Sequence, residues 1–582
     1  MVSVTALGCG SDAPDETTLP RPEVTELLAH YDSQFAPAAS MLQESFNSPG
    51  YHSAIEPGAP VHPTRESLIY ALALLQRNDE GDAQRAADII TAVLSLQDSD
   101  PSSPTCGVWP WLLEEPIDQM ESPDMNWADF CAASIVHMLK RHAEQLPSDV
   151  ASDMRESLRL ATNAIRRRNV GPGYSNIAIL GGGACAAAGE VLDDDDLLAY
   201  GRTRLQAVVA HVEKHDGFTE YNSPPYARVV LAECDRALQL LDDDASRAAA
   251  ETLHRSAWKM IAESFHPATQ QWAGPHSRTS RVRLRRETVE FLGRRVGLPL
   301  ETHPSKLDGK PRGYAVVRPV ACPDGLIPAF TRQIDEPYEI QRTFINARDR
   351  KNRRVGITWL SSTACLGSVN RASFWTQRKP LIGYWKTGTD PAVCFRVRFL
   401  HNGQDFASMG MQTVQNGPRT LSALYSIPGR GDWHPSLDRP QDGTFHAASL
   451  CWRFELSGVG VSGTEIDSTQ QQSRRFELAV GDHRIVVHAP TGCEFARTPV
   501  HWELQTLPDV VCVDCVCYDG EARPFDFSDP IDMSVAAGVE LLGRHESAAE
   551  LPPSVSRRAA DWKLPSSPVM RIALPKQSAV QP

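Results

Sequence analysis

The sequence predicts a multidomain chain with an all-α half followed by an all-β half. The first half is predicted to be an incomplete (α/α) toroid of helical hairpins, and the second an antiparallel β-sandwich. Two observations predict this order: apolar residues recur with a helical period over 21–300, and they alternate with polar residues over 314–550. A third is length, because 582 residues are too many for one core.

The helical half is interpreted as hairpins because its segments come in pairs that short polar turns separate. The first pair is TRESLIYALALLQR, with Thr64 as a plausible N-cap, and GDAQRAADIITAVLSLQ. Since no fixed-period sequence repeat is visible, a toroid of hairpins fits better than a regular solenoid. Further pairs are expected at 127–145 with 149–168, 176–192 with 195–214, and 224–241 with 244–265.

The segment 301–313 is rich in Pro, Gly and Lys and is predicted to be a linker. Short alternating runs such as VGITWLSS, AVCFRVRFL and HRIVVHA follow, and Gly, Asn, Asp and Pro punctuate them. This pattern is typical of antiparallel sheets in a sandwich. The tail 551–582, rich in Pro, Ser and Ala, is predicted to be mostly irregular.

Residues 1–20 are predicted to be a polar leader, either a lipoprotein start or a signal remnant. Ala-Leu-Gly precedes Cys9 and an acidic polar stretch follows it, although the apolar stretch is short for a signal. The expected location is therefore periplasmic, lipid-anchored or secreted, with the cytoplasm as the alternative. No transmembrane span is expected, because no apolar run approaches about 18 residues.

Composition limits the partners and cofactors. A net charge of −14 disfavours nucleic acid, which needs a dominant basic face, but it allows an anionic glycan in a locally basic cleft. The 13 scattered cysteines predict mostly buried free thiols, with room for one or two bridges. Cys512, Cys515 and Cys517 resemble half a zinc site without a second half, so no cofactor is expected and ligand spacing does not support a structural metal. The sequence does not specify an oligomer.

Two tryptophan-containing stretches are candidates for binding sugar. CGVWPWLLEEP places Trp109 and Trp111 on a loop bounded by prolines, and NWADFCAA places Asn126 at a helix start. Apolar CH faces of sugars pack against aromatic rings, which favours substrate binding. Each tryptophan could equally close a hairpin core.

The segment 215–226, HDGFTEYNSPPY, holds more polar aromatic residues than a turn needs. Glu220, Tyr221, Asn222 and Tyr226 are therefore candidate site residues on a loop that a rigid scaffold positions. The two prolines restrict the backbone just before Tyr226. The alternative is that the rings pad the base of the next helix.

Two further stretches carry polar candidates. Asn176 opens a helix after the turn in NVGPGYSNIAILGG, where it could also serve only as an N-cap. The stretch WAGPHSRTSRVRLRR gathers charge near the domain junction, either to bind a carboxylate or sulfate or as a solvated face. Its basic residues are His276, Arg278, Arg281, Arg283, Arg285 and Arg286.

This arrangement resembles the polysaccharide lyases of the heparinase II/III and alginate lyase type, which join an incomplete toroid to β-sandwich sheets. Their upstream Asn is matched by Asn176. Here Tyr-Asn-Ser precedes the prolines and no His follows Asn176, both of which depart from the family pattern. The family segment D-G-x-(Y/F)-x-E-G-P-x-Y is echoed by Asp216, Gly217, Phe218, Glu220, Pro224, Pro225 and Tyr226.

The resemblance implies cleavage of a uronic-acid-containing glycan by β-elimination. An Asn such as Asn176, or a protonated His, would neutralise the carboxylate, and a tyrosine would act as base and acid. Tyr226 is the first candidate and Tyr221 the second, with Arg278 holding a substrate anion. The family also implies a histidine from the sheet domain. The candidates are His434 and His446, with His276 as a competitor.

Two other functions remain open from the sequence. A glycoside hydrolase on the same toroid would need a carboxylate pair, for which Glu220 with Asp129 or Asp216 is a candidate. A non-catalytic glycan-binding protein would use Trp109, Trp111 and the arginines. A lyase leaves an unsaturated uronate that absorbs light, whereas a hydrolase does not.

Overall fold

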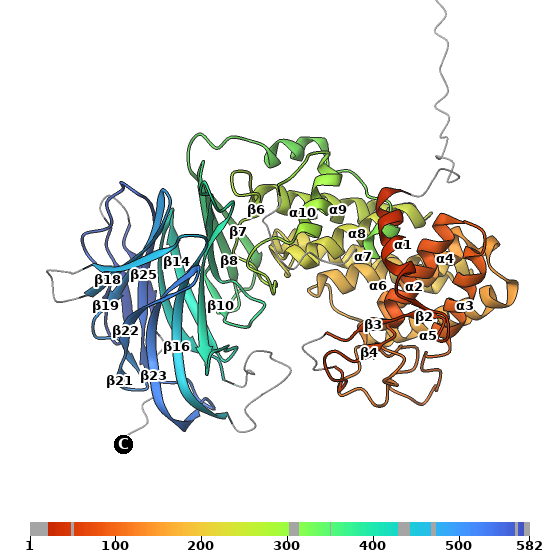
Figure 1. Cartoon of the computed structure of the whole chain (residues 1–582), viewed down its shortest axis with the longest axis horizontal. Helices are drawn as coiled ribbons and strands as arrows, with labels where there is room; N and C mark the ends of the chain where they lie inside the picture. The colour runs from red at the N-terminus through yellow and green to blue at the C-terminus, as the bar shows by residue number, and fades with distance from the viewer. Residues whose placement is uncertain are drawn as a thin grey trace, which may run out of the picture.

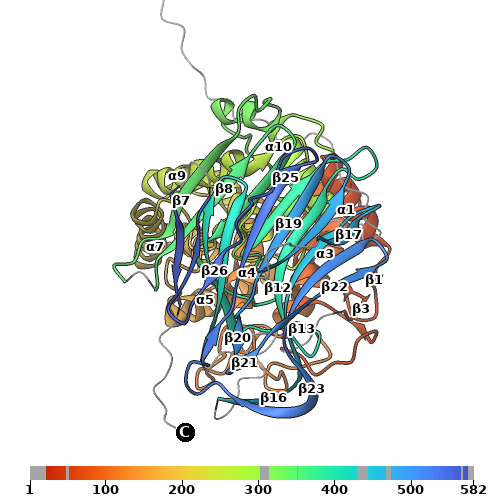
Figure 2. The same cartoon turned by 90° about the vertical axis from the view of Figure 1, so that its left-hand side faces the viewer.

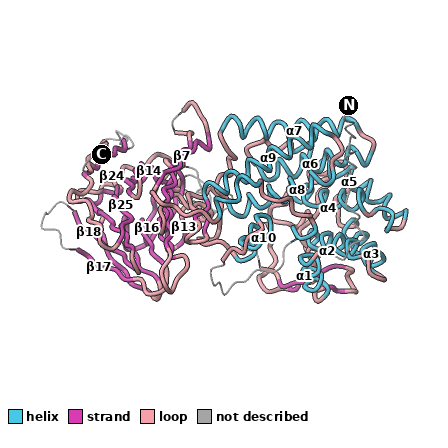
Figure 3. The backbone as a smooth tube through the Cα atoms, turned by 90° about the horizontal axis from the view of Figure 1, so that it is seen from above, coloured by secondary structure: helices cyan, strands magenta, loops and turns pink. Residues whose placement is uncertain are grey.

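The computed structural model describes residues 21–47, 52–301, 313–349, 351–428, 443–466, 473–564 and 568–574. The helical half and the sheet half lie side by side along the longest axis (Figure 1). Helices and strands are almost completely segregated between the two halves when the chain is seen from above (Figure 3). The predicted order, helical hairpins followed by antiparallel sheets, is confirmed.

The helices form two layers, as expected for an incomplete toroid. In the inner layer each helix packs against the next, from α2 through α4, α6 and α8 to α10. Because the two helices of each hairpin run in opposite directions, the inner helices all begin at the same rim. The inner helices are α2 Thr64–Arg77, α4 Asn126–Arg141, α6 Ser175–Leu192, α8 Pro224–Leu240 and α10 Arg286–Val296. The others are α1 Pro22–Asp32, α3 Asp82–Leu94, α5 Ser148–Arg168, α7 Asp195–His215 and α9 Asp244–Ser264, with a short 3-10 turn, η1, at Ala143–Gln145.

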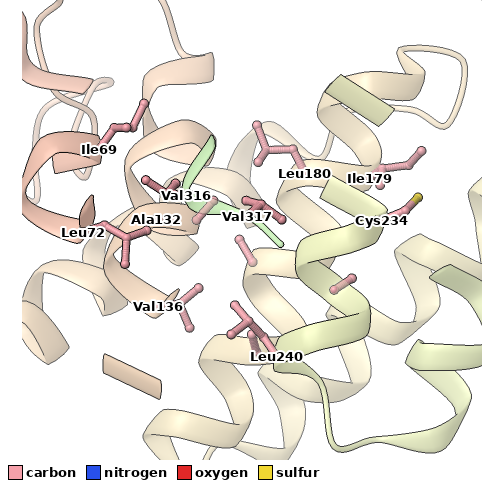
Figure 4. Close-up of a cluster of buried hydrophobic side chains, with 14 of the residues drawn as sticks. Ile69, Leu72, Ala132, Val136, Ile179, Leu180, Cys234, Leu240, Val316 and Val317 are labelled. Atoms are coloured by element: carbon pink, nitrogen blue, oxygen red, sulfur yellow. The ribbon is translucent and has the colours of Figure 1, made fainter. Parts of the chain in front are cut away.

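Helix α6 is the centre of the helical core. Its small residues let α7 approach closely, and a Cβ added at Gly201 of α7 would lie 2.3 Å from the backbone nitrogen of Ala186. By length and composition α6 could cross a membrane, but 83% of it is buried inside the protein, as a core helix would be. Ile179 and Leu180 of α6 belong to one buried cluster with side chains of α4, of α8 and of the segment around Val316 (Figure 4).

The helical half extends further than predicted. Two 3-10 turns, η2 Gly313–Val316 and η3 Asp324–Phe330, add Val316, Val317 and Phe330 to the helical core. Long-range hydrogen bonds hold this segment, including one from Gln76 Nε2 to the backbone oxygen of Val316 at 2.7 Å. The first strand of the sheet half begins only at Tyr338. The predicted start at 314 is therefore too early, because the apolar residues that follow the linker are buried against helices.

The sheet half packs two antiparallel sheets around one core, which confirms the predicted sandwich (Figure 2). The larger runs β22-β23-β16-β12-β11-β9-β8-β7, with β13 beside β12, and the smaller runs β10-β14-β15-β25-β19-β18-β17. The larger sheet comprises β7 Tyr338–Ile345, β8 Arg354–Leu360, β9 Ala364–Val369, β11 Leu381–Trp385, β12 Val393–His401, β13 Gln404–Asp405, β16 Thr444–Ser457, β22 His501–Leu507 and β23 Val510–Asp526. The smaller comprises β10 Arg371–Ser373, β14 Met409–Asn416, β15 Arg419–Ser426, β17 Ser462–Ile466, β18 Ser473–Val480, β19 His483–Pro490 and β25 Ala536–Gly543.

Short strands complete the described fold, and three of them lie in the tail that is predicted to be mostly irregular. Trp562 is 0% exposed and packs with Leu421 and Ala423 of the smaller sheet, so its burial orders this part of the tail. The tail strands are β26 Ser554–Val555, β27 Ala559–Trp562 and β28 Met570–Ala573. The remaining strands are β1 Phe35–Ala36, β2 Met41–Leu42, β3 Glu44–Ser45, β4 Pro60–Val61, β5 Phe265–His266, β6 Gln271–Trp272, β20 Glu494–Phe495, β21 Thr498–Pro499 and β24 Met533–Ser534.

The cysteines in the described part of the chain are all free thiols, and most are buried. Cys512, Cys515 and Cys517 lie buried in β23, and no group of His, Cys, Asp or Glu suited to a metal occurs within the described ranges. Cys9 and the predicted leader 1–20 lie outside the described residues, so the predicted export stays a prediction.

The close contact between α6 and α7 predicts opposite effects for two glycine substitutions. Gly201→Ala should lower the free energy of unfolding by about 1–3 kcal/mol, because the new Cβ would meet the backbone of α6. The control is Gly183→Ala in α6, where the nearest atom, Ala237 Cβ, is 3.8 Å away. That change should stabilise by up to about 1 kcal/mol through helix propensity. Urea unfolding measures both, and equal effects would contradict the packing described.

Candidate active site

Glu220, in the loop between α7 and α8, joins three parts of the chain at the rim where the inner helices begin. Its Oε1 accepts a hydrogen bond from Arg278 Nη1 at 2.8 Å. Its Oε2 accepts from both Asn176 Nδ2 at 2.6 Å and the Asn176 backbone nitrogen at 3.1 Å. A carboxylate at the N-terminus of α6 is also favoured by the helix dipole. Glu220 therefore fixes Arg278 relative to α6.

Arg278 links this carboxylate to Tyr226. Its Nη2 donates to Tyr226 Oη at 2.6 Å, and its guanidinium carbon lies 4.0 Å from the centre of the Tyr226 ring. Burial alone would lower the pKa of Arg278, but Tyr226 and Glu220 raise it above its usual value. The guanidinium is therefore charged at any physiological pH. Tyr226 lies half-buried in the first turn of α8, directly after Pro224 and Pro225.

The surroundings of Arg278 come from both halves of the protein. Its Nε faces Gln377 Oε1 at 3.3 Å, and its guanidinium lies 5.4 Å from the ring of Trp375. Both residues follow β10 in the sheet half. The ring of Tyr174, just before α6, lies 6.0 Å away. Trp375 and Gln377 are not predictable from the sequence, because no local pattern marks a side chain that contacts a residue about 100 positions earlier.

The rim continues from Tyr174 toward a group of aromatic side chains. Asn126 Nδ2 approaches Tyr174 Oη at 3.4 Å, while Asn126 Oδ1 accepts from Arg168 at 2.7 Å. Further along, the ring of Trp111 lies 5.1 Å from Trp127. Asn126 and Trp111 are both half-buried at this rim, so the structure brings these two predicted residues to the same side as Tyr226.

Three other predicted residues are structural. Trp109 is 0% exposed and donates to the Val93 carbonyl, so the expectation that its ring contacts sugar is wrong. Tyr221 is 5% exposed and stacks on Phe344 with the ring centres 4.1 Å apart, and burial raises the pKa of its hydroxyl. Asn222 is 1% exposed and bonds to Trp272 Nε1. Tyr221 and Asn222 therefore seal the junction between the halves and do not face a cleft.

Of the predicted histidines, His276 and His446 belong to the described part of the chain. His276 is 3% exposed, and its Nδ1 donates to the Asn222 carbonyl at 2.6 Å. Burial lowers its pKa to about 4, so the ring is neutral at neutral pH. His446 is an exposed residue of β16, and His434 lies outside the described residues.

The carboxylates considered for a hydrolase are not arranged as a catalytic pair. Asp129 is 1% exposed in the core, where a Cβ added at Gly181 would lie 2.2 Å from its Oδ1. Asp216 has a side chain 67% exposed, 3.6 Å from Arg342. Glu220 already uses both oxygens. Neither proposed partner faces Glu220 across a cleft.

One family model and several solved structures are similar to this chain. A family model described as "Domain of unknown function (DUF8769)" matches residues 32–289. No curated protein matches the sequence. Among solved structures, the crystal structure of heparinase III is similar at 11% identity and a TM-score of 0.43, covering 98% of this chain and 93% of that one.

Two further solved structures are similar. A heparan sulfate lyase HepC mutant from Pedobacter heparinus is 9% identical with a TM-score of 0.36, covering 98% of this chain and 92% of that one. A chondroitin AC lyase from Streptomyces coelicolor A3, in complex with chondroitin sulphate, is 10% identical with a TM-score of 0.34, covering 91% and 98%. Such scores describe a likeness in overall layout alone. The evidence for function therefore has to come from the side chains.

Asp129 predicts a pH dependence of stability. Burial raises the pKa of this carboxyl from 3.8 to about 7 in the folded protein. The group thus contributes stability that is fully present below its unfolded pKa and is lost as the pH rises through about 7. Asp129→Asn cannot titrate. Between pH 4 and pH 8 the free energy of unfolding of the unchanged protein should fall relative to Asp129→Asn, by a few kcal/mol. Parallel curves in urea unfolding would contradict the raised pKa.

Proposed function

We propose that this protein is a polysaccharide lyase that cleaves a uronic-acid-containing glycan by β-elimination. The observation that carries the proposal is the hydrogen bond from Arg278 Nη2 to Tyr226 Oη at 2.6 Å, at a half-buried position on the rim. A cationic donor on a phenol oxygen favours the phenolate. Tyrosine becomes usable as a general base in that form.

The proposed reaction assigns the proton and the electrons as follows. Tyr226 Oη takes the C5 proton of the uronate, the electron pair forms the C4–C5 double bond, and the bond from C4 to the linking oxygen breaks. The leaving oxygen then receives a proton, and Tyr226, now protonated, is the nearest acid. His276 is less suited to this step, because its ring is neutral and its Nδ1 is bound to Asn222.

Negative charge increases on the uronate carboxylate as the C5 proton leaves, and cationic or amide donors fixed beside it lower the barrier. Arg278 has more N–H donors than its contacts to Glu220, Tyr226 and Gln377 use. Asn176 is 1% exposed and gives one amide hydrogen to Glu220. We assign Arg278 to the carboxylate, and we assign Asn176 and Glu220 to positioning Arg278.

Tyr226→Phe tests the base directly. It removes only the phenol oxygen, so we expect folding to survive and turnover to fall by about 10² or more, the scale of a lost acid–base group. Turnover is followed by the absorbance of the unsaturated product, on a panel of uronate polymers that differ in sulfation.

The matched control is Tyr221→Phe, five positions away on the same segment. Its ring should still stack on Phe344, so turnover should stay within a few-fold. Full activity in Tyr226→Phe would refute the tyrosine mechanism. If the unchanged protein binds polymers without cleaving any of them, a non-catalytic glycan-binding role replaces the lyase.

Arg278→Gln tests how the base is activated. Without the cation the phenolate forms only at higher pH, so the rising limb of the pH–rate profile should move to higher pH and turnover at neutral pH should fall. Arg286→Gln is the control in the same basic stretch, because Arg286 pairs with Glu290 and its side chain is 56% exposed. An unshifted profile in Arg278→Gln would show that Arg278 does not act on the base.

A further inference from the structure

The turn between β10 and β11 brings the sheet half to Arg278. Gln377 of this turn accepts a hydrogen bond from Arg278 Nε through its Oε1, at 3.3 Å. The ring of Trp375, in the same turn, lies 5.4 Å from the guanidinium carbon. Both side chains are only half-buried, so they are partly open to solvent. A substrate bound at Arg278 would therefore meet the sheet half at this turn.

The backbone of this turn is fixed to the basic stretch. The Thr279 nitrogen donates to the Gln377 carbonyl at 2.5 Å, beside an antiparallel bridge between His276 and Lys379. Lys379 is 4% exposed, and its Nζ donates to the Thr279 carbonyl at 3.0 Å and to the Thr376 carbonyl at 2.6 Å. Gln377 therefore stands on a backbone that is held in place before any ligand arrives, as precise binding requires.

The contact with Arg278 decides which way the Gln377 side-chain amide faces. A guanidinium only donates hydrogen bonds, so the atom that faces Arg278 Nε must be the amide oxygen. The amide nitrogen Nε2 then keeps both of its hydrogens for other partners. Within the described residues Nε2 has no hydrogen-bond partner, and it is accessible to solvent. Gln377 thus offers an oriented donor beside a cation.

Elimination creates a need for such a donor. As the C5 proton leaves, negative charge increases on both oxygens of the uronate carboxylate, and donors fixed in advance stabilise it. Asn176 is buried and bonded to Glu220, so it serves to position Arg278. A neutral amide next to Arg278 adds a hydrogen bond without a second cation, which would need its own compensating charge.

We propose that Gln377 Nε2 binds the uronate carboxylate of the substrate, next to Arg278. The carboxylate would then be held between the helical half, through Arg278, and the sheet half, through Gln377. This assignment rests on the proposed function for the identity of the ligand. It makes Gln377 a specificity-determining residue, because the donor pair favours a carboxylate over the hydroxymethyl group of a neutral sugar.

Calorimetric titration of the full chain tests this assignment, with Tyr226→Phe in every protein so that cleavage does not interfere. The probes are a hexasaccharide of alternating glucuronate and N-acetylglucosamine and a hexamannuronate, each beside a derivative whose carboxyl groups are reduced to alcohols. We expect at least one acidic hexasaccharide to bind. Gln377→Ala should raise its Kd about tenfold, the scale of a lost hydrogen bond to a charged group, and should leave the Kd of the reduced derivative unchanged.

The control is Gln206→Ala, at an exposed position of α7, which should not change any Kd. Gln377→Ala should fold, because the contacts that fix the turn are made by its backbone and by Lys379. A double-mutant cycle separates binding by Gln377 from positioning of Arg278. If Gln377 only held Arg278, then Gln377→Ala would have no further effect once Arg278→Gln is present. We expect it to raise Kd several-fold in that background as well.

The outcomes distinguish this proposal from the lyase proposal. If Gln377→Ala raises Kd as expected but the unchanged protein cleaves no polymer, the lyase proposal fails and the carboxylate contact stands. If the unchanged protein cleaves but Gln377→Ala leaves Kd unchanged, or weakens acidic and reduced hexasaccharides alike, the assignment of Gln377 fails. An absent effect in the Arg278→Gln background, or failure of both acidic hexasaccharides to bind, would also overturn it.

Discussion

The bridge that Glu220 makes between Asn176 and Arg278 is the interaction on which the rim depends. Two opposite charges in a poorly hydrated place are stable only when each is hydrogen-bonded. Here the carboxylate is satisfied by the start of α6 on one side and by Arg278 on the other. Arg278 is thereby held against Tyr226. The surroundings of the tyrosine therefore depend on the ion pair between Glu220 and Arg278, which Tyr226 does not itself form.

The segment 273–285 is the second half of this constraint, because both halves of the protein hold it. On the sheet side, Arg283 donates to backbone oxygens of the larger sheet, and Lys379 Nζ donates to the Thr279 carbonyl at 3.0 Å. On the helix side, Ser223 Oγ donates to the Arg278 carbonyl at 2.5 Å. The basic stretch therefore joins the two halves of the protein. It is not simply a charged surface that faces solvent.

Periodicity was enough to predict the fold class, because a change from helical to alternating patterning needs no knowledge of long-range contacts. The proline pair before Tyr226 and the helix start at Asn176 were also local signals. Trp109 and Trp111 show the limit of such reasoning. They lie two residues apart on one loop, yet one is in the core and the other at the rim, and only the packing of distant helices decides between them.

Contacts between distant residues account for the other differences. Asn176 and Glu220 are 44 positions apart, and Arg278 and Gln377 are 99 apart, so no spacing rule could join them. The 3-10 segment around Val316 and the tail strand containing Trp562 have few local signals of their own. Both are ordered by apolar side chains buried on surfaces that other elements supply. The sequence therefore indicated the elements and several residues of the candidate site, but not the partners that hold those residues in place.

The water balance of the reaction tests the central claim most directly. Elimination divides a glycan without adding water, whereas hydrolysis adds one water molecule for each bond broken. Mass spectrometry of the products from a purified uronate oligosaccharide, with cleavage carried out in ¹⁸O-labelled water, distinguishes the two. We predict product masses that sum to the mass of the substrate and contain no ¹⁸O from the cleavage. Products that gain one labelled oxygen per bond would contradict the account.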